Sequence, residues 1–186
     1  MINLTSLLNG RAYRLNATEI LAWYEEHVRE AWASTLRQAG DAIAVAGTAF
    51  GVLIRGGEAV DAFAAHNIVT NAGRAHIIDR LQAASAAVCD YMAIGTSTTA
   101  ADAADTTLGT ETGTRVQGTL SQPTAYTDRL VSTFAAGNGT ATIGEVGRLN
   151  ASTSGTLMGR LVLSPTKVKG ADDSLQVTYD FTYAAS

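Results

Sequence analysis

Apolar residues recur at every third or fourth position between Asn16 and Ala39, which is the period of an amphipathic helix. Asn16 suits the N-cap of this helix, and Gly40 suits its C-terminal stop. We therefore expect residues 1–40 to form an N-terminal helical arm. Its contacts are expected to involve an apolar stripe and the tryptophan beside it, namely Trp23, Tyr24, Val28, Trp32 and Leu36. The stripe would pack either on the same chain or on another subunit.

The period changes to two in the residues before Gly56-Gly57, as expected of a β-strand. Two successive glycines readily adopt the positive φ angles of a two-residue hairpin turn. Counting back from this turn predicts that Arg55 lies opposite Glu58. The same count predicts that Phe50 lies opposite Phe63, as an aromatic pair on one face.

A short helix is expected after the hairpin, from Arg74 to Ala84. Ile77, Ile78 and Leu81 are predicted to face the protein interior. We expect this helix to lie across the sheet as a lid.

The rest of the chain predicts further strands, at residues 91–96, 113–119, 126–135, 139–149, 157–168 and 173–184. The last of these is the clearest, because apolar and polar residues alternate strictly from Leu175 to Tyr183. Short strands with turn signals at this spacing favour a mainly β fold. We predict an antiparallel β-sandwich or jelly-roll-like domain over residues 41–186, with a short lid helix and an N-terminal helical extension.

Charge and composition narrow the classes of partner. The formal net charge is −4, only 16% of residues are charged, and Lys and Arg form no run. Nucleic-acid binding depends on clustered cations, so we expect no nucleic acid partner. No segment reaches the ~18 consecutive apolar residues of a membrane-spanning helix, and no secretory signal is recognisable. We therefore expect no membrane partner and synthesis in the cytoplasm.

Residue types that carry chemistry are scattered along the chain. His27, His66 and His76 lack the spacing of a metal site. Cys89 is the only cysteine and lies among Ala and Val, where a buried small side chain is expected. Neither a nucleophile elbow nor a phosphate-binding loop occurs. We expect no catalytic residue, no cofactor and no bound metal, and a protein that is not an enzyme.

Two groups of carboxylates leave a calcium site open as an alternative. One group is Asp102, Asp105 and Glu111, and the other is Asp172 and Asp173. Carboxylates are suitable calcium ligands, but neither group has the dense spacing of a calcium-binding loop. Solvated turns are the other interpretation.

Glu145 is unusual because it lies within the apolar strand segment 143–147. A carboxylate buried there needs a partner. Arg148 or Arg160 would provide a structural salt bridge, and participation in catalysis is the alternative.

Several segments together resemble a group of small structural proteins of tailed-bacteriophage virions. They are His66–Gly73, Met92–Ala100, Asp105–Leu108, Gly144–Gly147, Met158–Arg160 and Asp172–Tyr179. In that group an Asn-hydrophobic-Val-x-Asn-x-Gly segment precedes a short helix, and a loop similar to Ile-Gly-Thr-Gly-Thr-Thr follows. The likeness covers about residues 45–184 and leaves out the N-terminal helix. Ser97 replaces the usual second glycine of the loop, which suggests a different loop conformation.

The resemblance implies a non-enzymatic virion component, made in the cytoplasm of a bacterial host. We expect a capsid-decorating (cement) protein that self-associates symmetrically, for example as a trimer, and that binds the major capsid protein or other virion proteins. A tail, neck or baseplate position for the same body is the nearest alternative. A carbohydrate- or receptor-binding module is an alternative of another class, in which Trp23 and Trp32 would stack on sugar.

Overall fold

The computed structural model describes residues 22, 43–82 and 86–185. The predicted helical arm therefore lies outside the described residues, except for Ala22, whose backbone is helical. The described elements are, in chain order, β1 (Ile43–Arg55), β2 (Glu58–Val69), α4 (Asn71–Gln82), β3 (Tyr91–Gly95), β4 (Glu111–Gln117), β5 (Thr119–Thr124), β6 (Thr127–Phe134), β7 (Ala141–Leu149), β8 (Leu157–Lys169) and β9 (Asp173–Ala185).

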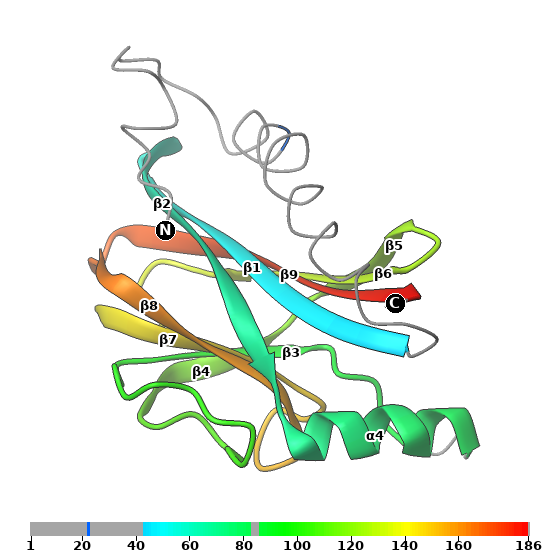
Figure 1. The fold of residues 1–186 in the computed structure, drawn as a ribbon. Helices are drawn as coiled ribbons and strands as arrows, with labels where there is room; N and C mark the ends of the chain where they lie inside the picture. Colours follow the sequence, from blue (N-terminus) through cyan, green and yellow to red (C-terminus); the bar gives the residue numbers. More distant parts are fainter. Residues whose placement is uncertain (1–21, 23–42, 83–85, 186) are drawn as a thin grey trace.

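These strands form one antiparallel sheet with the order β4-β3-β7-β8-β2-β1-β9-β6-β5 (Figure 1). The prediction of a mainly β, antiparallel protein with one short helix is thus confirmed for the described residues. The sequence predicted two packed sheets, whereas the strands form a single curled sheet, a half-barrel. The sheet is continuous because β2 pairs with β1 along its length and also with β8, through Ile68 and Val69 alone.

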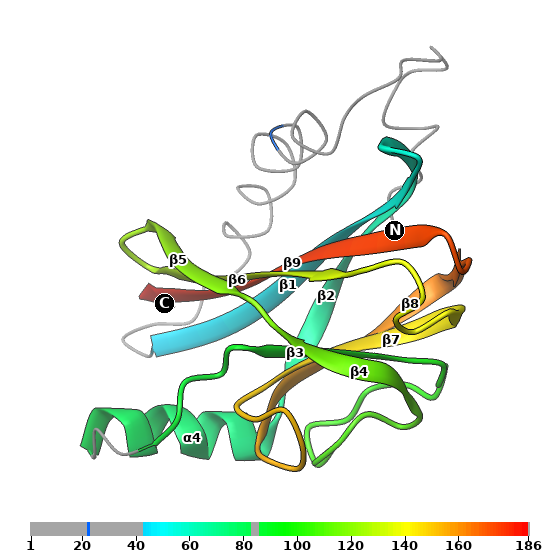
Figure 2. The same cartoon turned by 180° about the vertical axis from the view of Figure 1, so that it is seen from behind.

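The curl brings the two halves of the sheet face to face, as the view from behind also shows (Figure 2). Met92 of β3 and Val146 of β7 pack in one buried cluster with Leu130 of β6 and Phe181 of β9. The predicted alternation of the last strand is confirmed, because its apolar residues from Leu175 to Phe181 all belong to this core. Burial of these side chains is the main source of stability.

The β1–β2 hairpin turns at Gly56 and Gly57, which have positive φ angles of 58° and 86°. Arg55 lies opposite Glu58, as predicted. The predicted Phe50–Phe63 pair is wrong, since a register shift between Leu53 and Ile54 offsets the hairpin by one residue. Phe50 therefore lies opposite Ala64, and Phe63 lies opposite Gly51. A bulge of this kind moves the two aromatic side chains to opposite faces.

One strand was missed by the sequence prediction. The segment Thr119–Thr124, of which only Thr119 was included in a predicted strand, forms β5 at the edge of the sheet. Its residues are exposed up to Pro123, so no alternation of buried and exposed positions marks it in the sequence.

Helix α4 begins three residues earlier than predicted, because Thr70 caps it. The Thr70 Oγ1 accepts the N–H of Gly73 at 2.9 Å and donates to the carbonyl of Leu157. The helix contacts β8 and lies at one end of the curled sheet (Figure 1). It is thereby fixed mainly through its first turn.

The predicted inward face of this helix is largely wrong. Ile77 packs against the core, but Ile78 is 50% exposed and Leu81 is 78% exposed. The buried helix residues are instead Gly73 and His76. The reason is that the helix approaches β8 closely at Gly73. Only the face that carries this glycine can come so near to the strand, so the buried face is determined by close packing and not by the number of apolar residues on it.

Replacing Gly73 with Ala tests this close approach. A Cβ at this position would clash with the backbone carbonyl of Met158. In an open helix the change would stabilise by about 1 kcal/mol, whereas here we expect it to destabilise by about 1–3 kcal/mol. Urea unfolding measures the difference. The control is Ala75→Gly at an exposed helix position, expected to cost about 1 kcal/mol. A more stable Gly73→Ala protein would contradict the packing described.

Candidate functional site

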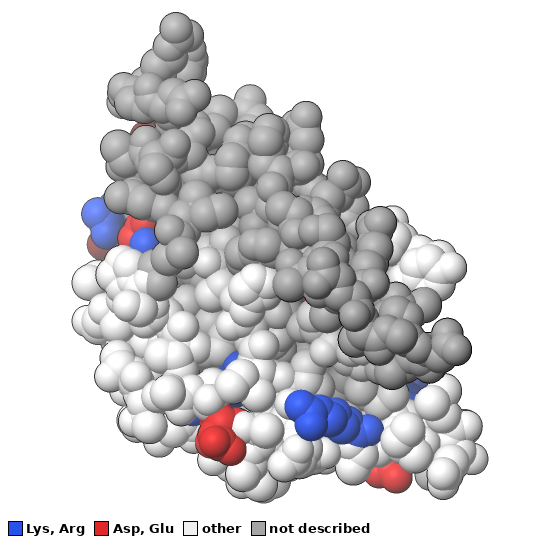
Figure 3. Space-filling view, viewed as in Figure 1, with Lys and Arg blue, Asp and Glu red and all other residues white. Residues whose placement is uncertain are grey.

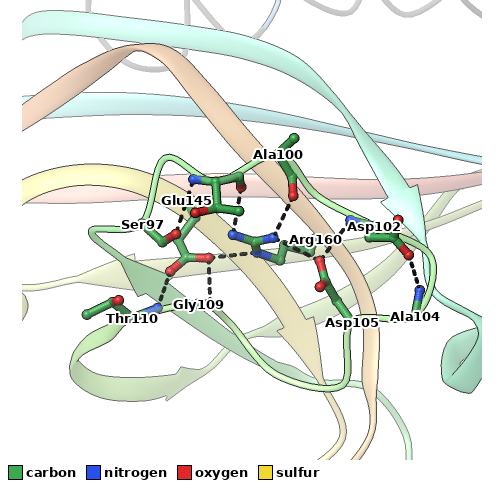
Figure 4. Close-up of polar contacts among 10 residues, drawn as sticks. Ser97, Ala100, Asp102, Ala104, Asp105, Gly109, Thr110, Glu145 and Arg160 are labelled. Atoms are coloured by element: carbon green, nitrogen blue, oxygen red, sulfur yellow. Dashed lines mark hydrogen bonds and ion pairs between the residues drawn. The ribbon is translucent and has the colours of Figure 1, made fainter.

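The loop of residues 96–110, between β3 and β4, is held by one buried carboxylate (Figure 4). Glu145 lies on β7 and is fully buried. Its Oε2 accepts the N–H of Gly109 at 2.9 Å, and its Oε1 accepts the N–H of Thr110 at 2.7 Å. The carbonyl of Thr110 in turn accepts the N–H of Thr96 at 2.8 Å. Both ends of the loop are therefore fixed next to Glu145.

Arg160 of β8 completes this anchor from the neighbouring strand. Its Nε donates to Glu145 Oε2 at 2.7 Å, and its Nη1 donates to Asp105 Oδ2 at 2.8 Å. The same guanidinium donates to the carbonyls of Thr99 at 3.1 Å and Ala100 at 3.4 Å. One arginine thus binds two carboxylates and two backbone carbonyls, using the fixed geometry of its planar guanidinium.

Two aspartates shape the middle of the loop. Asp105 Oδ2 accepts the N–H of Asp102 at 2.9 Å, and Asp102 Oδ1 accepts the N–H of Ala104 at 2.8 Å. Burial works to raise the pKa of Asp105, but the hydrogen bond from Asp102 and the Arg160 guanidinium outweigh it and lower this pKa below its ordinary value. Asp105 therefore stays ionised beside Arg160 at neutral pH.

The loop also packs closely on the sheet. Leu108 is buried in a small apolar cluster with Ala93, Leu149 and Leu157. Gly144 of β7 lies directly under the loop, where a Cβ would be 2.6 Å from the carbonyl oxygen of Ser97. A side chain at residue 144 would push the loop away, so the sequence Gly144-Glu145 combines close approach with the anchoring carboxylate.

Ser97 occupies the loop position at which the expected pattern has glycine. Among the described non-glycine residues only Ser154 has a positive φ angle, so the backbone of Ser97 does not need glycine. Its Oγ accepts the N–H of Thr99 at 3.2 Å. Serine therefore supplies a hydrogen bond within the loop that glycine would lack.

The charges of the anchor point inward, and mostly neutral groups point outward. The exposed loop residues are Thr96, Thr98, Thr99, Ala100, Asp102, Ala104, Thr106, Thr107, Gly109 and Thr110. Both oxygens of Glu145 are already occupied by N–H donors. The salt bridge considered for Glu145 is observed, with Arg160 as the partner. The arrangement positions a loop and leaves this carboxylate no free oxygen for a reactant.

Arg148, the other partner considered for Glu145, instead joins the two halves of the sheet. It extends from β7, and its Nη2 donates to the carboxylate of Asp128 on β6 at 2.8 Å. Its Nε donates to the carbonyl of Cys89 at 2.7 Å, and its guanidinium lies 5.3 Å from the ring centroid of Phe181. Cys89 is buried as predicted, and burial raises the pKa of its thiol to about 11.

A third charged group closes the β8–β9 turn. Asp173, fully buried, accepts hydrogen bonds from Arg55 Nε at 2.6 Å and from the N–H of Gly170 at 2.8 Å. The Arg55 and Gly170 hydrogen bonds lower the pKa of Asp173 from 3.8 to about 2. Lys169 donates to the carbonyls of Asp173 and Ala135, at 2.7 and 3.0 Å.

Four of the five carboxylates considered for calcium bind protein groups, and the fifth, Asp172, is exposed. Asp102 and Asp105 belong to the loop anchor, Glu111 pairs with Arg115 at 2.7 Å, and Asp173 binds Arg55. Within the described part of the chain, no group of three or more His, Cys, Asp or Glu residues is placed to hold a metal ion.

The two described histidines, His66 and His76, lie on different elements, β2 and α4. His76 is buried, and its Nε2 lies 2.8 Å from the carbonyl of Ala87. His66 is on β2, and His27 lies outside the described residues. The predicted interaction residues also lie outside them: Trp23, Tyr24, Val28, Trp32 and Leu36.

Sequence reasoning named Arg160 as one possible partner of Glu145, but it missed the role of Asp105 and the hydrogen bonds that tie the 96–110 loop to this pair. The available signal was Glu145 in an apolar strand with Gly144 before it, which called for a partner approaching closely. Among the described residues there is also no helix of the length and apolarity needed to cross a membrane. Comparison of the chain with protein-family models, with curated proteins and with solved structures finds no match.

Substitutions at Arg160 and Glu145 test whether the two side chains stabilise the protein as a pair. Replacing Arg160 with Met keeps much of the side-chain volume but leaves Glu145 buried without its cation, so we expect a loss of about 3–5 kcal/mol in the free energy of unfolding. Glu145→Gln should be similarly harmful, and the double variant should lose much less than the sum of both. Denaturant titration of all four proteins measures the coupling. Additive losses would show that the pair does not act as a unit.

A second prediction concerns pH. Because the folded pKa of Asp173 lies below its ordinary value of 3.8, its contribution to stability is complete above about pH 4 and is lost as the pH falls towards 2. The difference in Tm between the wild type and Asp173→Asn should therefore shrink over this interval. Asp172→Asn, at an exposed neighbour, is the control and should follow the wild type. A constant difference between wild type and Asp173→Asn would disprove the assignment.

Proposed function

We propose that this chain is a non-enzymatic structural component of a tailed-phage virion, and specifically a capsid-decorating (cement) protein. The observation that supports this most is the 96–110 loop, in which Asp105 binds inward to Arg160 and two backbone N–H groups bind inward to Glu145, while mostly Thr and Ala face outward. This loop is also one of the segments that resemble phage structural proteins. The proposal treats the facing halves of the curled sheet as a sandwich-like body that carries the loop.

A rigid, nearly neutral loop is suited to assembly. Thr and Ala side chains carry no charge that must be desolvated when a neighbour covers them. The loop is already ordered before binding, so less conformational entropy is lost on contact. Figure 3 shows that the described surface on one face is mostly uncharged, with only a few Lys, Arg, Asp and Glu side chains.

Symmetry would multiply such modest contacts. A closed oligomer, with a trimer as the expected form, presents several copies of the loop to a repeating capsid lattice. Each copy can then bind weakly while the oligomer binds firmly. The expected partners are thus a second copy of this chain and the major capsid protein, in a virion assembled in the cytoplasm of the host bacterium.

Co-sedimentation with empty capsids of the encoding phage tests the proposal. The wild-type protein should bind at a fixed ratio to the capsid subunits, and light scattering should give the mass of a defined oligomer. Binding to tails or necks in place of capsids would contradict the capsid position and assign the protein to the tail or neck. A monomer that binds no virion part, but binds a sugar, would contradict the proposal.

The loop itself is tested by Thr98→Lys, which adds a charge to its exposed surface. We expect this variant to fold normally and to bind capsids at least tenfold more weakly, which corresponds to about 1.4 kcal/mol. The matched control is Thr119→Lys, also exposed but on β5, at the other end of the strand order. Equal binding by both variants would show that the loop is not the contact surface.

A further inference from the structure

The outer face of strands β2, β1, β9 and β6 carries a strip of buried side chains. The inner face of these strands packs on the other half of the sheet, for example through Ala49, Phe63 and Leu130. Residues that alternate with these inner residues point to the opposite face. On that face the following residues have an exposed fraction of 7% or less: Phe50, Val52, Ala62, Ala64, Arg129, Thr178 and Asp180.

Strand register makes this strip continuous. In order across the sheet it runs from Ala62 to Val52, then through Phe50 with Ala64, to Thr178, Asp180 and Arg129. The strip crosses four strands diagonally and is about 20 Å long, at ~4.8 Å per strand and ~3.3 Å per residue. Its apolar end is Ala62, Val52 and Phe50, and its polar end is the Arg129–Asp180 pair, joined at 2.7 and 2.8 Å.

An apolar sheet face must be covered by another layer. The described helix is at a different place, because α4 contacts β8 (Figure 1). We propose that the strip is the docking surface for residues 16–39 of the same chain, the predicted amphipathic helix. This inference does not rest on the proposed virion function.

The dimensions of the predicted helix fit the strip. Residues 16–39 would form a helix about 36 Å long, enough to cross the strip diagonally. Ala62 and Ala64 are small, so a helix can approach the sheet closely there. Ala22 has a helical backbone and is exposed, and at roughly 100° per residue it lies beside the apolar stripe instead of within it.

Chain continuity favours docking on the same molecule. Residues 40–42 alone separate the predicted helix from β1, which lies in the centre of the strip. Three residues reach about 10 Å at most. The end of the helix is therefore held beside this face, which raises its effective concentration far above that of a second copy in dilute solution.

The two tryptophans of the chain distinguish the predicted faces of the helix. At roughly 100° per residue, Trp32 lies within about 20° of Leu21 in the stripe, whereas Trp23 lies about 160° from Leu21, on the opposite side of the predicted helix and not beside the stripe as first expected. Docking therefore buries Trp32 and leaves Trp23 facing outward. Because the chain has only these two tryptophans, tryptophan emission reports on the predicted helix alone.

The test uses the full chain with Trp23→Phe, so that Trp32 is the only tryptophan, and excites tryptophan selectively over tyrosine. We expect blue-shifted emission and weak quenching by iodide, both independent of protein concentration. Val52→Lys, within the strip, should shift the emission to the red and increase the quenching constant several-fold. Val168→Lys is the control, since Val168 is already 65% exposed on β8, and it should change neither.

Val28→Glu provides a second variant that leaves the sheet sequence intact. It should expose Trp32 as Val52→Lys does. If circular dichroism shows that Val52→Lys is unfolded, Val28→Glu is the variant that tests the docking. Protection of Trp32 that appears only at concentrations where light scattering detects an oligomer would overturn the proposal and make a second copy the occupant. An exposed Trp32 at all concentrations would also overturn it.

Discussion

The shape of the exposed 96–110 loop depends on the buried ion pair between Arg160 and Glu145. Removing two charges from water is costly, and their attraction offsets that cost only when the remaining hydrogen-bonding groups are also satisfied. Here the missing donors and acceptors come from the 96–110 loop: two N–H groups bind Glu145, and two carbonyls and Asp105 bind Arg160. The loop and the pair therefore stabilise each other, because releasing the loop would leave charges unpaired inside the protein. An exposed loop composed mostly of Thr and Ala acquires in this way a fixed shape.

Other buried charges fix the arrangement of the strands. Arg148 binds Asp128 across the core and connects the two halves of the sheet, while Arg129 and Asp180 pair between neighbouring strands. A slip of β6 along β9 by one residue would place Arg129 and Asp180 on opposite faces. Such pairs add little net stability compared with apolar residues, but they penalise alternative registers. The apolar core supplies the stabilising free energy, and the charged pairs select one alignment.

The sequence predicted those features that follow from local pattern. The alternation in β9, the turn at Gly56-Gly57 and the need of Glu145 for a partner were all visible in it. The curl of the sheet was not, since it depends on the contact of Ile68 and Val69 with β8, and strands in a sandwich show the same alternation. The bulge in β2 also escaped prediction, because nothing in the sequence marks Val60 as an extra residue. The pairing of Asp105 with Arg160, 55 residues apart, could not be read from spacing.

The central claim is that buried charges hold the 96–110 loop rigid at the surface. Amide hydrogen exchange of the wild-type protein, followed residue by residue by NMR, tests it most directly. Gly109 and Thr110 are exposed, but their N–H groups bind Glu145. We predict that these two amides exchange as slowly as those of the interior strand β7, because they open only when the ion pair opens. Exchange at the rate of an unstructured peptide would show that the loop is mobile and would contradict the account.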